Sequence, residues 1–192
     1  VSVGDIGNDK PIPDRFAYCM PDRISPTKSG GNINPAISWS GAPEGTKSYA
    51  IIVVDPDVPA SFELANQPHK IIPVDYPRRN FYHWVLVNIP VTVTSLAEGQ
   101  DSKGVNPDGK PTGKLAYGLT GHNDYSNHNG GYDGPCPPWN DAHLHHYHFR
   151  VFALDVPALQ FAAEFGGKEA EAAMAGHVLA QGEVVGTYTN NP

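Results

Sequence analysis

GPCPP at residues 134–138 and HLHHYHF at residues 143–149 are the stretches from which the fold of this chain can be worked out. Three prolines within four residues exclude a helix or a central strand there, because proline fixes φ and lacks a backbone N–H. The residues that follow alternate as a β-strand does, so His145 and Tyr147 point to one face and His146 to the other. A rigid loop therefore delivers a histidine and a tyrosine to one face of a strand.

Length and composition limit the class of protein. A chain of 192 residues is long enough for one domain with a full core and short for two, so we expect residues 1–192 to form a single domain. The 20 glycines and 19 prolines favour short strands and ordered loops over a helical bundle. A formal charge of −7 argues against nucleic acid as the main partner.

The sequence contains no run of about 18 apolar residues, so we expect a soluble protein without a transmembrane segment. It begins at Val1, which leaves open whether a signal peptide has been removed. The compartment, cytoplasmic or periplasmic, therefore stays open.

Three apolar runs predict the central strands of a sheet: Ser48–Asp55, Phe81–Ile89 and Leu144–Asp155. The first is apolar at nearly every position, as in a strand covered on both faces, and we expect it to end at the prolines of DPDVP, residues 55–59. Residues 36–40 predict a further short strand.

Helical spacing occurs late in the chain. Residues 157–165 and 168–181 predict two helices, the second because Ala170, Met174 and Val178 repeat at helical intervals before Gly182. Residues 182–189 then return as a strand. We therefore expect a mainly β protein, a β-sandwich with a few peripheral C-terminal helices.

The two cysteines, Cys19 and Cys136, leave two alternatives open. They form a disulfide if the N-terminal arm folds back towards the proline-rich loop, or they are two ordinary buried thiols. Two thiols without a CxxC motif are a weak basis for a zinc site.

Polar residues stand at the ends of the three predicted strands: Asp55, Asp57, His83, His145 and Tyr147. If these strand ends meet, they form a small pocket with histidine and tyrosine donors and carboxylate acceptors, which suits a phosphate or carboxylate that bears a nearby amine. The alternative is structural, with Asp-Pro as a turn former and the histidines as ordinary core or surface residues.

The motifs DPDVP (55–59), HWVLVNIP (83–90) and GPCPP followed by HHY (145–147) together resemble the phosphatidylethanolamine-binding protein family, and more narrowly its bacterial branch of Raf-kinase-inhibitor-like proteins. PAISWSG (35–41) and GEVVGTY (182–188) add to the resemblance.

This resemblance implies a β-sandwich with a small anion-binding pocket near one end of the sheets. We expect neither enzymatic activity nor a cofactor. Members of the family bind phosphoethanolamine-like head groups, phosphate or acetate there. Motif matching assigns the following residues to ligand binding: Asp55, Asp57, His83, Gly134, Pro138, His145 and Tyr147. If His83 and His145 face the pocket, their protonated forms supply positive charge, and anion affinity is expected to rise as the pH falls.

Two other functions can be weighed from the residues. The histidine-rich run, with His83, His122, His128 and the two aspartates, contains ligands enough for zinc, yet strand alternation separates His145 from His146. At most part of the cluster can therefore converge, and we expect no metal. A hydrolase lacks support because the chain has no G-x-S-x-G motif and no serine beside a motif histidine.

A protein inhibitor or scaffold is the remaining alternative, since members of the family also act on other proteins. Residues 60–80 and 106–131 would then be the contact loops, because binding functions concentrate in such segments. A homodimer is a further expectation from the resemblance, since bacterial relatives are often dimers.

Overall fold

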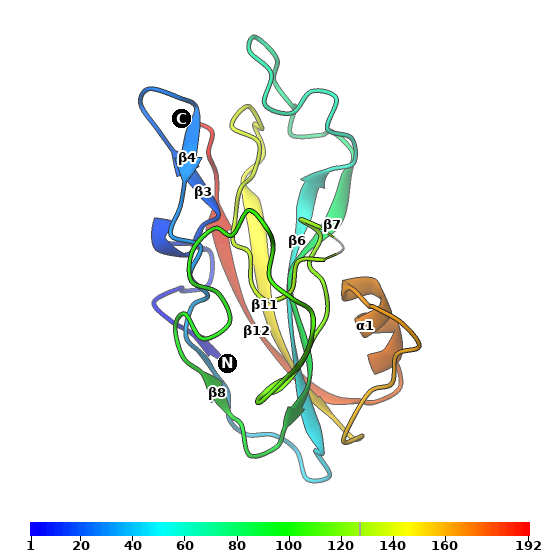
Figure 1. Cartoon of the computed structure of the whole chain (residues 1–192). Helices are drawn as coiled ribbons and strands as arrows, with labels where there is room; N and C mark the ends of the chain where they lie inside the picture. Colours follow the sequence, from blue (N-terminus) through cyan, green and yellow to red (C-terminus); the bar gives the residue numbers. More distant parts are fainter. Residues whose placement is uncertain (127) are drawn as a thin grey trace.

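The computed structural model describes residues 1–126 and 128–192 and is built mainly of β-strands (Figure 1). Seven strands form one sheet in the order β2-β12-β11-β6-β7-β10-β9, and three form a second in the order β1-β5-β8. The prediction of a mainly β fold is confirmed.

Four long strands make the centre of the large sheet. They are β6 (Ser48–Pro59), β7 (Arg78–Pro90), β11 (His145–Leu154) and β12 (Val178–Tyr188), and each pairs antiparallel with its neighbour. The other strands are short: β1 (Ser2–Val3), β2 (Lys10–Pro11), β3 (Cys19–Pro21), β4 (Thr27–Ser29), β5 (Ile37–Ser38), β8 (Ser95–Leu96), β9 (Gly113–Leu115) and β10 (Gly118–Thr120).

Both faces of the large sheet are covered, which explains the continuous apolar run of β6. On one face Ile51 and Val53 join a core that includes Ile37 and Leu96 of the small sheet. On the other face the helix α1 (Gly167–Met174) packs Met174 and its neighbours onto β6 and β7. Each fully buried aliphatic side chain contributes about 1.5–3 kcal/mol, so this two-sided burial holds the central strands in place. The alternation predicted for residues 145–153 is also present, since the odd-numbered residues are all buried and those from Tyr147 to Ala153 belong to the first core.

The helical predictions are partly wrong. Residues 157–165 form no helix, because the Asn88 side chain of β7 donates to the Leu159 carbonyl at 3.1 Å and accepts the Leu159 N–H at 2.7 Å. The helix predicted for residues 168–181 ends at Met174, since Gly176 takes φ +83° and β12 begins at Val178. Among the described residues, α1 is the single α-helix.

The strand expected to end at Asp55 continues to Pro59. Val58 pairs with Arg79 and Pro59 with Arg78, after a register shift that begins at Asp55. An irregularity of this kind accommodates proline, because residues within it are not required to donate to the ladder. The same irregularity changes the direction in which the Asp57 side chain points relative to the Asp55 side chain.

The N-terminal arm folds back onto the large sheet, and Cys19 and Cys136 form a disulfide with an S–S distance of 2.00 Å. Of the two alternatives left by the sequence, the structure has the bridged one. In the part of the chain that the structure describes, no helix has the length and apolar character needed to cross a membrane.

Candidate functional site

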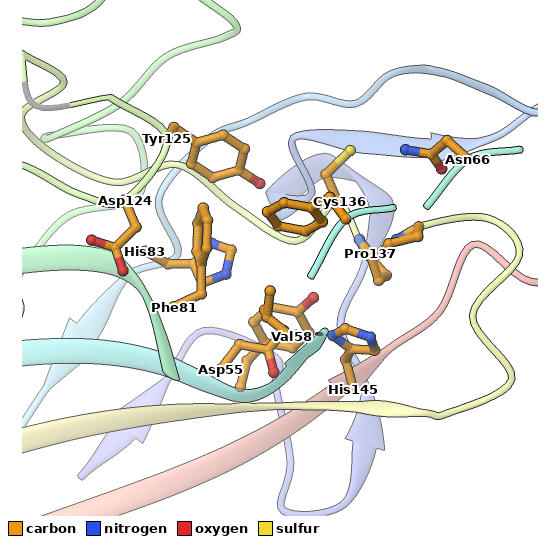
Figure 2. Close-up of a pocket in the computed structure, with 13 residues that line it drawn as sticks. Asp55, Val58, Asn66, Phe81, His83, Asp124, Tyr125, Cys136, Pro137 and His145 are labelled. Carbon is orange, nitrogen blue, oxygen red and sulfur yellow. Dashed lines mark hydrogen bonds and ion pairs between the residues drawn. The ribbon is translucent and has the colours of Figure 1, made fainter. Parts of the chain in front are cut away.

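A cavity of about 290 Å³ lies where β6, β7 and β11 approach the proline-rich loop (Figure 2). Its polar lining consists of Asp55, Asn66, His83, Asp124, Tyr125, His145 and Tyr147. Its apolar lining consists of Val58, Phe62, Phe81, Cys136, Pro137 and Pro138. One pocket therefore combines ionisable groups with a wall of aromatic rings and prolines.

His145 sits between two carboxylates at the base of this pocket. Its Nδ1 lies 2.6 Å from Oδ2 of Asp55, and its Nε2 lies 3.0 Å from Oδ2 of Asp141. Asp141 also accepts two hydrogen bonds from the Arg78 guanidinium, at 2.5 and 3.0 Å. The four groups form a chain of alternating charges that joins β6, β7, β11 and the loop before β11.

Burial and hydrogen bonding act in opposite directions on this chain. Burial would lower the pKa of His145, but its hydrogen bonds to Asp141 and Asp55 outweigh burial and raise the pKa to about 9. Burial would raise the pKa of Asp141, and its hydrogen bonds from His145 and Arg78 lower it to about 2. His145 is therefore an imidazolium at neutral pH, with both N–H groups already used.

His83 has the opposite character. Its Nδ1 donates to the backbone carbonyl of Asp133 at 2.7 Å, while its buried Nε2 has no hydrogen-bond partner among the described residues. Burial lowers the pKa of His83, and the nearby charge of Asp55 opposes this only in part. The ring is therefore neutral at neutral pH. His83 is one of the residues that line the pocket (Figure 2), so the unpartnered nitrogen lies on a pocket residue.

The tautomer of His83 is fixed by a buried network around Asp133. The Asp133 carboxylate accepts hydrogen bonds from the side chains of Asn32, Asn123 and Asn129 at 2.6–2.7 Å and from Lys110 at 2.8 Å. This network holds the backbone carbonyl of residue 133 in place, and with it the His83 ring.

The aromatic wall is also held by specific contacts. The Tyr125 hydroxyl donates to the Gly134 carbonyl at 2.7 Å, and the Tyr125 ring meets Phe81 edge to face at 5.1 Å. The ring of Tyr18, from the N-terminal arm, stacks on the ring of Tyr125 with the two ring centroids 4.6 Å apart. Burial, the largest cause, raises the pKa of Tyr125 well above its ordinary value, so the hydroxyl stays protonated.

Five of the seven residues assigned to ligand binding from the sequence line the pocket: Asp55, His83, Pro138, His145 and Tyr147. Their part in ligand binding stays a prediction.

Two assigned residues lie elsewhere. Gly134 is behind the wall, where an added Cβ would come within 1.9 Å of the Phe16 carbonyl oxygen, so it supports the pocket without facing it. Asp57 does not line the pocket and instead contacts His143 and His146.

Sequence reasoning missed part of the lining. Asp124 and Tyr125 lie in the long segment before the proline-rich loop, and Phe62 and Asn66 lie in the loop between β6 and β7. Neither loop has periodicity, so no pattern in the sequence indicates which of their residues turn inward.

The fold and the pocket together define a β-sandwich protein with a cavity at the end of its central strands. The family model described as "Phosphatidylethanolamine-binding protein" matches residues 4–189. The chain belongs to the phosphatidylethanolamine-binding protein family, which confirms the resemblance found in its motifs.

Individual relatives agree with this assignment. A UPF0098 protein of Pyrococcus horikoshii is 35% identical over 182 residues, which are 95% of this chain and 72% of that protein. The UPF0098 protein YbcL of Escherichia coli is 34% identical over 161 residues, which are 83% of this chain and 73% of YbcL.

Solved structures show the same fold. The crystal structure of E. coli YbcL, described as a member of the mammalian PEBP family, superposes with a TM-score of 0.72 at 28% identity, covering 98% of this chain and 96% of YbcL. The homologue CT736 of Chlamydia trachomatis superposes with a TM-score of 0.66 at 28% identity, covering 96% and 94%.

Proposed function

We propose that the pocket binds a small anion, and in particular a phosphorylated group that carries an amine, as phosphoethanolamine does. The observation that carries this proposal is the buried Nε2 of His83, which has no partner among the described residues. An unsatisfied buried polar atom costs about 1–3 kcal/mol, so a ligand that bonds to it gains this energy back.

The neighbouring groups favour a zwitterion over a simple anion. Asp55 and Asp124 both line the pocket, and carboxylates repel a phosphate while attracting an ammonium group. Phe81, Tyr125 and Pro137 provide apolar surface for the carbons between the two charges. A head group with phosphate near His83 and amine near Asp124 satisfies both sides.

Of the two histidines expected to supply positive charge to an anion, only His83 can do so. His145 has its two nitrogens occupied by Asp55 and Asp141, so it has no N–H left for an anion. A neutral His83 offers a lone pair at Nε2 and must take up a proton to donate to an anion. Affinity for anions is therefore expected to rise as the pH falls, through His83 alone.

We also propose that the site binds its ligand without converting it. Cys136 lines the pocket but is in a disulfide, so its sulfur is not a free nucleophile. His145 is held as an imidazolium by two carboxylates and has no lone pair with which to act as a base.

Calorimetric titration with phosphoethanolamine, phosphate and acetate tests the binding proposal. His83→Asn keeps a donor near the position of Nδ1 and removes Nε2, so we expect it to weaken phosphoethanolamine binding at least about tenfold. His148→Asn is the matched control, because His148 pairs with Glu183 away from the pocket. Titrations in buffers of different ionisation enthalpy count the protons taken up.

Three outcomes would overturn the proposal. The first is that none of the three ligands binds to the wild type. The second is that His83→Asn and wild type bind phosphoethanolamine equally well. The third, which overturns the choice of a zwitterion, is that phosphate binds as tightly as phosphoethanolamine.

We propose protein contacts at the loop between β6 and β7 as a second function, with another copy of this chain as the first partner to test. Ile71 and Val74, three positions apart in this loop, are 70% and 57% exposed, and exposed apolar side chains gathered on one loop are a feature of contact surfaces. Light scattering after gel filtration should give a dimer for the wild type and a monomer for the Ile71→Ser, Val74→Ser variant. A monomeric wild type would exclude self-association.

A further inference from the structure

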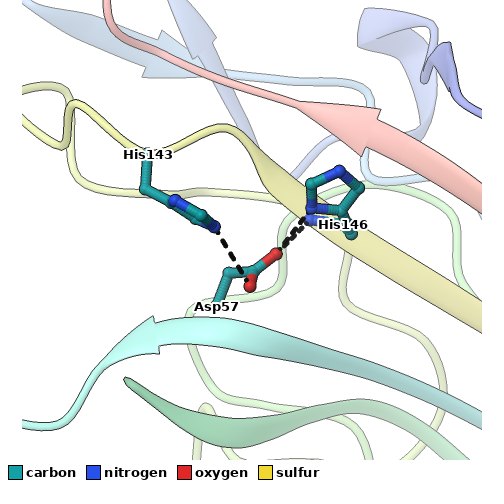
Figure 3. A group of neighbouring side chains, drawn as sticks. All are labelled: Asp57, His143 and His146. Atoms are coloured by element: carbon teal, nitrogen blue, oxygen red, sulfur yellow. Dashed lines mark hydrogen bonds and ion pairs between the residues drawn. The ribbon is translucent and has the colours of Figure 1, made fainter. Parts of the chain in front are cut away.

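Asp57, His143 and His146 form a cluster outside the pocket (Figure 3). Nε2 of His143 lies 3.2 Å from Oδ1 of Asp57, and Nδ1 of His146 lies 2.8 Å from Oδ2 of Asp57. One ligand atom from each of the three residues can be chosen so that all lie within 4.8 Å of one another. The three ligand atoms therefore converge on one small region between the side chains.

The backbone explains why these residues meet. The register shift that begins at Asp55 lets Asp57 point away from the pocket that Asp55 lines. Strand alternation sends His146 to the face opposite His145, which is the same side as Asp57. The Asp141 carboxylate accepts the His143 N–H at 2.9 Å and so fixes the turn that carries His143 towards this side.

The carboxylate of the cluster is already oriented by the backbone. Oδ2 of Asp57 accepts the backbone N–H of His146 at 2.9 Å, which leaves Oδ1 on the side of His143. A carboxylate that a backbone N–H holds in one orientation is already positioned to serve as a metal ligand.

The cluster is sheltered but open to solvent. The side chains of Asp57, His143 and His146 are 17%, 26% and 37% exposed. An ion can therefore reach them from water, and at least one coordination position remains for a water molecule. Three protein ligands with an open fourth position is the arrangement of accessible, exchangeable zinc sites rather than closed structural ones.

We propose that Asp57, His143 and His146 bind a divalent transition-metal ion, with Zn²⁺ as the ion that best suits the donors. Two imidazoles and one carboxylate are typical ligands of Zn²⁺ and disfavour Mg²⁺ and Ca²⁺, which prefer oxygen. Zn–N and Zn–O bonds of about 2.0–2.2 Å place ligand atoms about 3.3 Å apart in a tetrahedron. The distances of 2.8 and 3.2 Å from Asp57 to the two histidines lie close to that spacing, and the two histidine nitrogens, within 4.8 Å of each other, would have to move closer together where they exceed it.

The competing interpretation is that Asp57 is only an ion-pair partner of the two histidines. A second histidine–aspartate pair in the same protein separates the two interpretations. His177 pairs with Asp155 at 2.8 Å on the surface, but that pair belongs to no three-residue group within the described residues. This pair contains one histidine and one aspartate, as each pair within the cluster does, but it lacks the third ligand.

Calorimetric titration with Zn²⁺ tests the proposal on tag-free protein that has been treated with a chelator and then dialysed. The wild type should bind one Zn²⁺ per chain. His146→Ala and His143→Ala should each weaken this binding at least about tenfold, since each removes one of three ligands. His177→Ala should leave it unchanged.

A spectroscopic measurement gives an independent readout. Co²⁺ in a site of low coordination number absorbs visible light much more strongly than hexaaqua Co²⁺, so the wild type should show this absorption and lose it on addition of Zn²⁺. His146→Gln, which keeps the size of the side chain, covers the case in which the alanine variant does not fold. A wild type that binds no Zn²⁺, or variants at positions 143 and 146 that bind as the wild type does, would overturn the proposal.

Discussion

The pKa of His145 predicts how the stability of this protein depends on pH. A histidine whose folded-state pKa is raised from 6.5 to about 9 stabilises the fold fully below the unfolded value, and this stabilisation is lost as the pH rises through the folded value. The difference corresponds to about 3 kcal/mol at low pH. Between about pH 7 and about pH 9, about 2 kcal/mol of it should disappear.

Other groups do not obscure this window. Burial lowers the pKa of His83, so its effect on stability falls below pH 6.5, where the unfolded chain takes up a proton that the folded one does not. The pKa values of Tyr125, Tyr132 and Tyr147 are raised above 10, mainly by burial, so these groups act at higher pH. The stability loss between about pH 7 and about pH 9 therefore reports mainly on His145.

Urea denaturation without reductant, repeated across this pH range, gives the free energy of unfolding. The wild type should lose about 2 kcal/mol, whereas His145→Gln should be less stable and nearly independent of pH. NMR titration of the histidine ring protons measures the pKa directly, without need of a stable variant. A wild-type stability that stays flat to about pH 9, or a His145 that titrates near 6.5, would refute the reasoning.

Three further predictions concern the packing around the site. Replacing Cys19 and Cys136 by alanine should reduce the free energy of unfolding by about 4 kcal/mol, because the bridge closes a loop with a sequence separation of 117; urea denaturation measures this, and an unchanged midpoint would contradict it. Asp133→Asn should cost about 3–5 kcal/mol, since it removes the buried charge that pairs with a lysine, and should shift the NMR signals of the His83 ring. Gly167→Ala should destabilise by about 1–3 kcal/mol, because the added Cβ would lie 2.1 Å from the Tyr82 ring; thermal melting without a decrease in midpoint would show that the helix moves freely.

The sequence predicted the centre of the fold well, because the apolar runs of β6, β7 and β11 are local signals of two-sided burial. It failed where a distant partner decides the local structure. Val178 completes a helical pattern with Met174, yet it begins a strand that pairs with β11 along its length. Residues 157–165 lack a helix because Asn88, some seventy positions earlier, binds the backbone of Leu159.

The candidate site was likewise predicted only in part from the sequence. Motifs identified five residues that line the pocket, but nothing local indicated that both nitrogens of His145 would be taken by Asp55 and Asp141. Strand alternation correctly separated His145 from His146. Alternation could not indicate that Asp57 joins His146, because it places Asp55 and Asp57 on one face, and only the register shift between Asp55 and Val58 separates them.

The segment around Cys19 and the segment around Asn190 meet at the wall of the pocket, and this has a consequence for synthesis on the ribosome. Cys19 is bridged to Cys136, and Asn190 donates hydrogen bonds to the sulfur of Cys19 and to the carbonyl of Pro137. β12 pairs with β2, which lies more than 160 positions earlier in the chain. A nascent chain therefore cannot complete this wall until Asn190 has left the exit tunnel, so the wall is completed only after β6, β7 and β11 have all been synthesised.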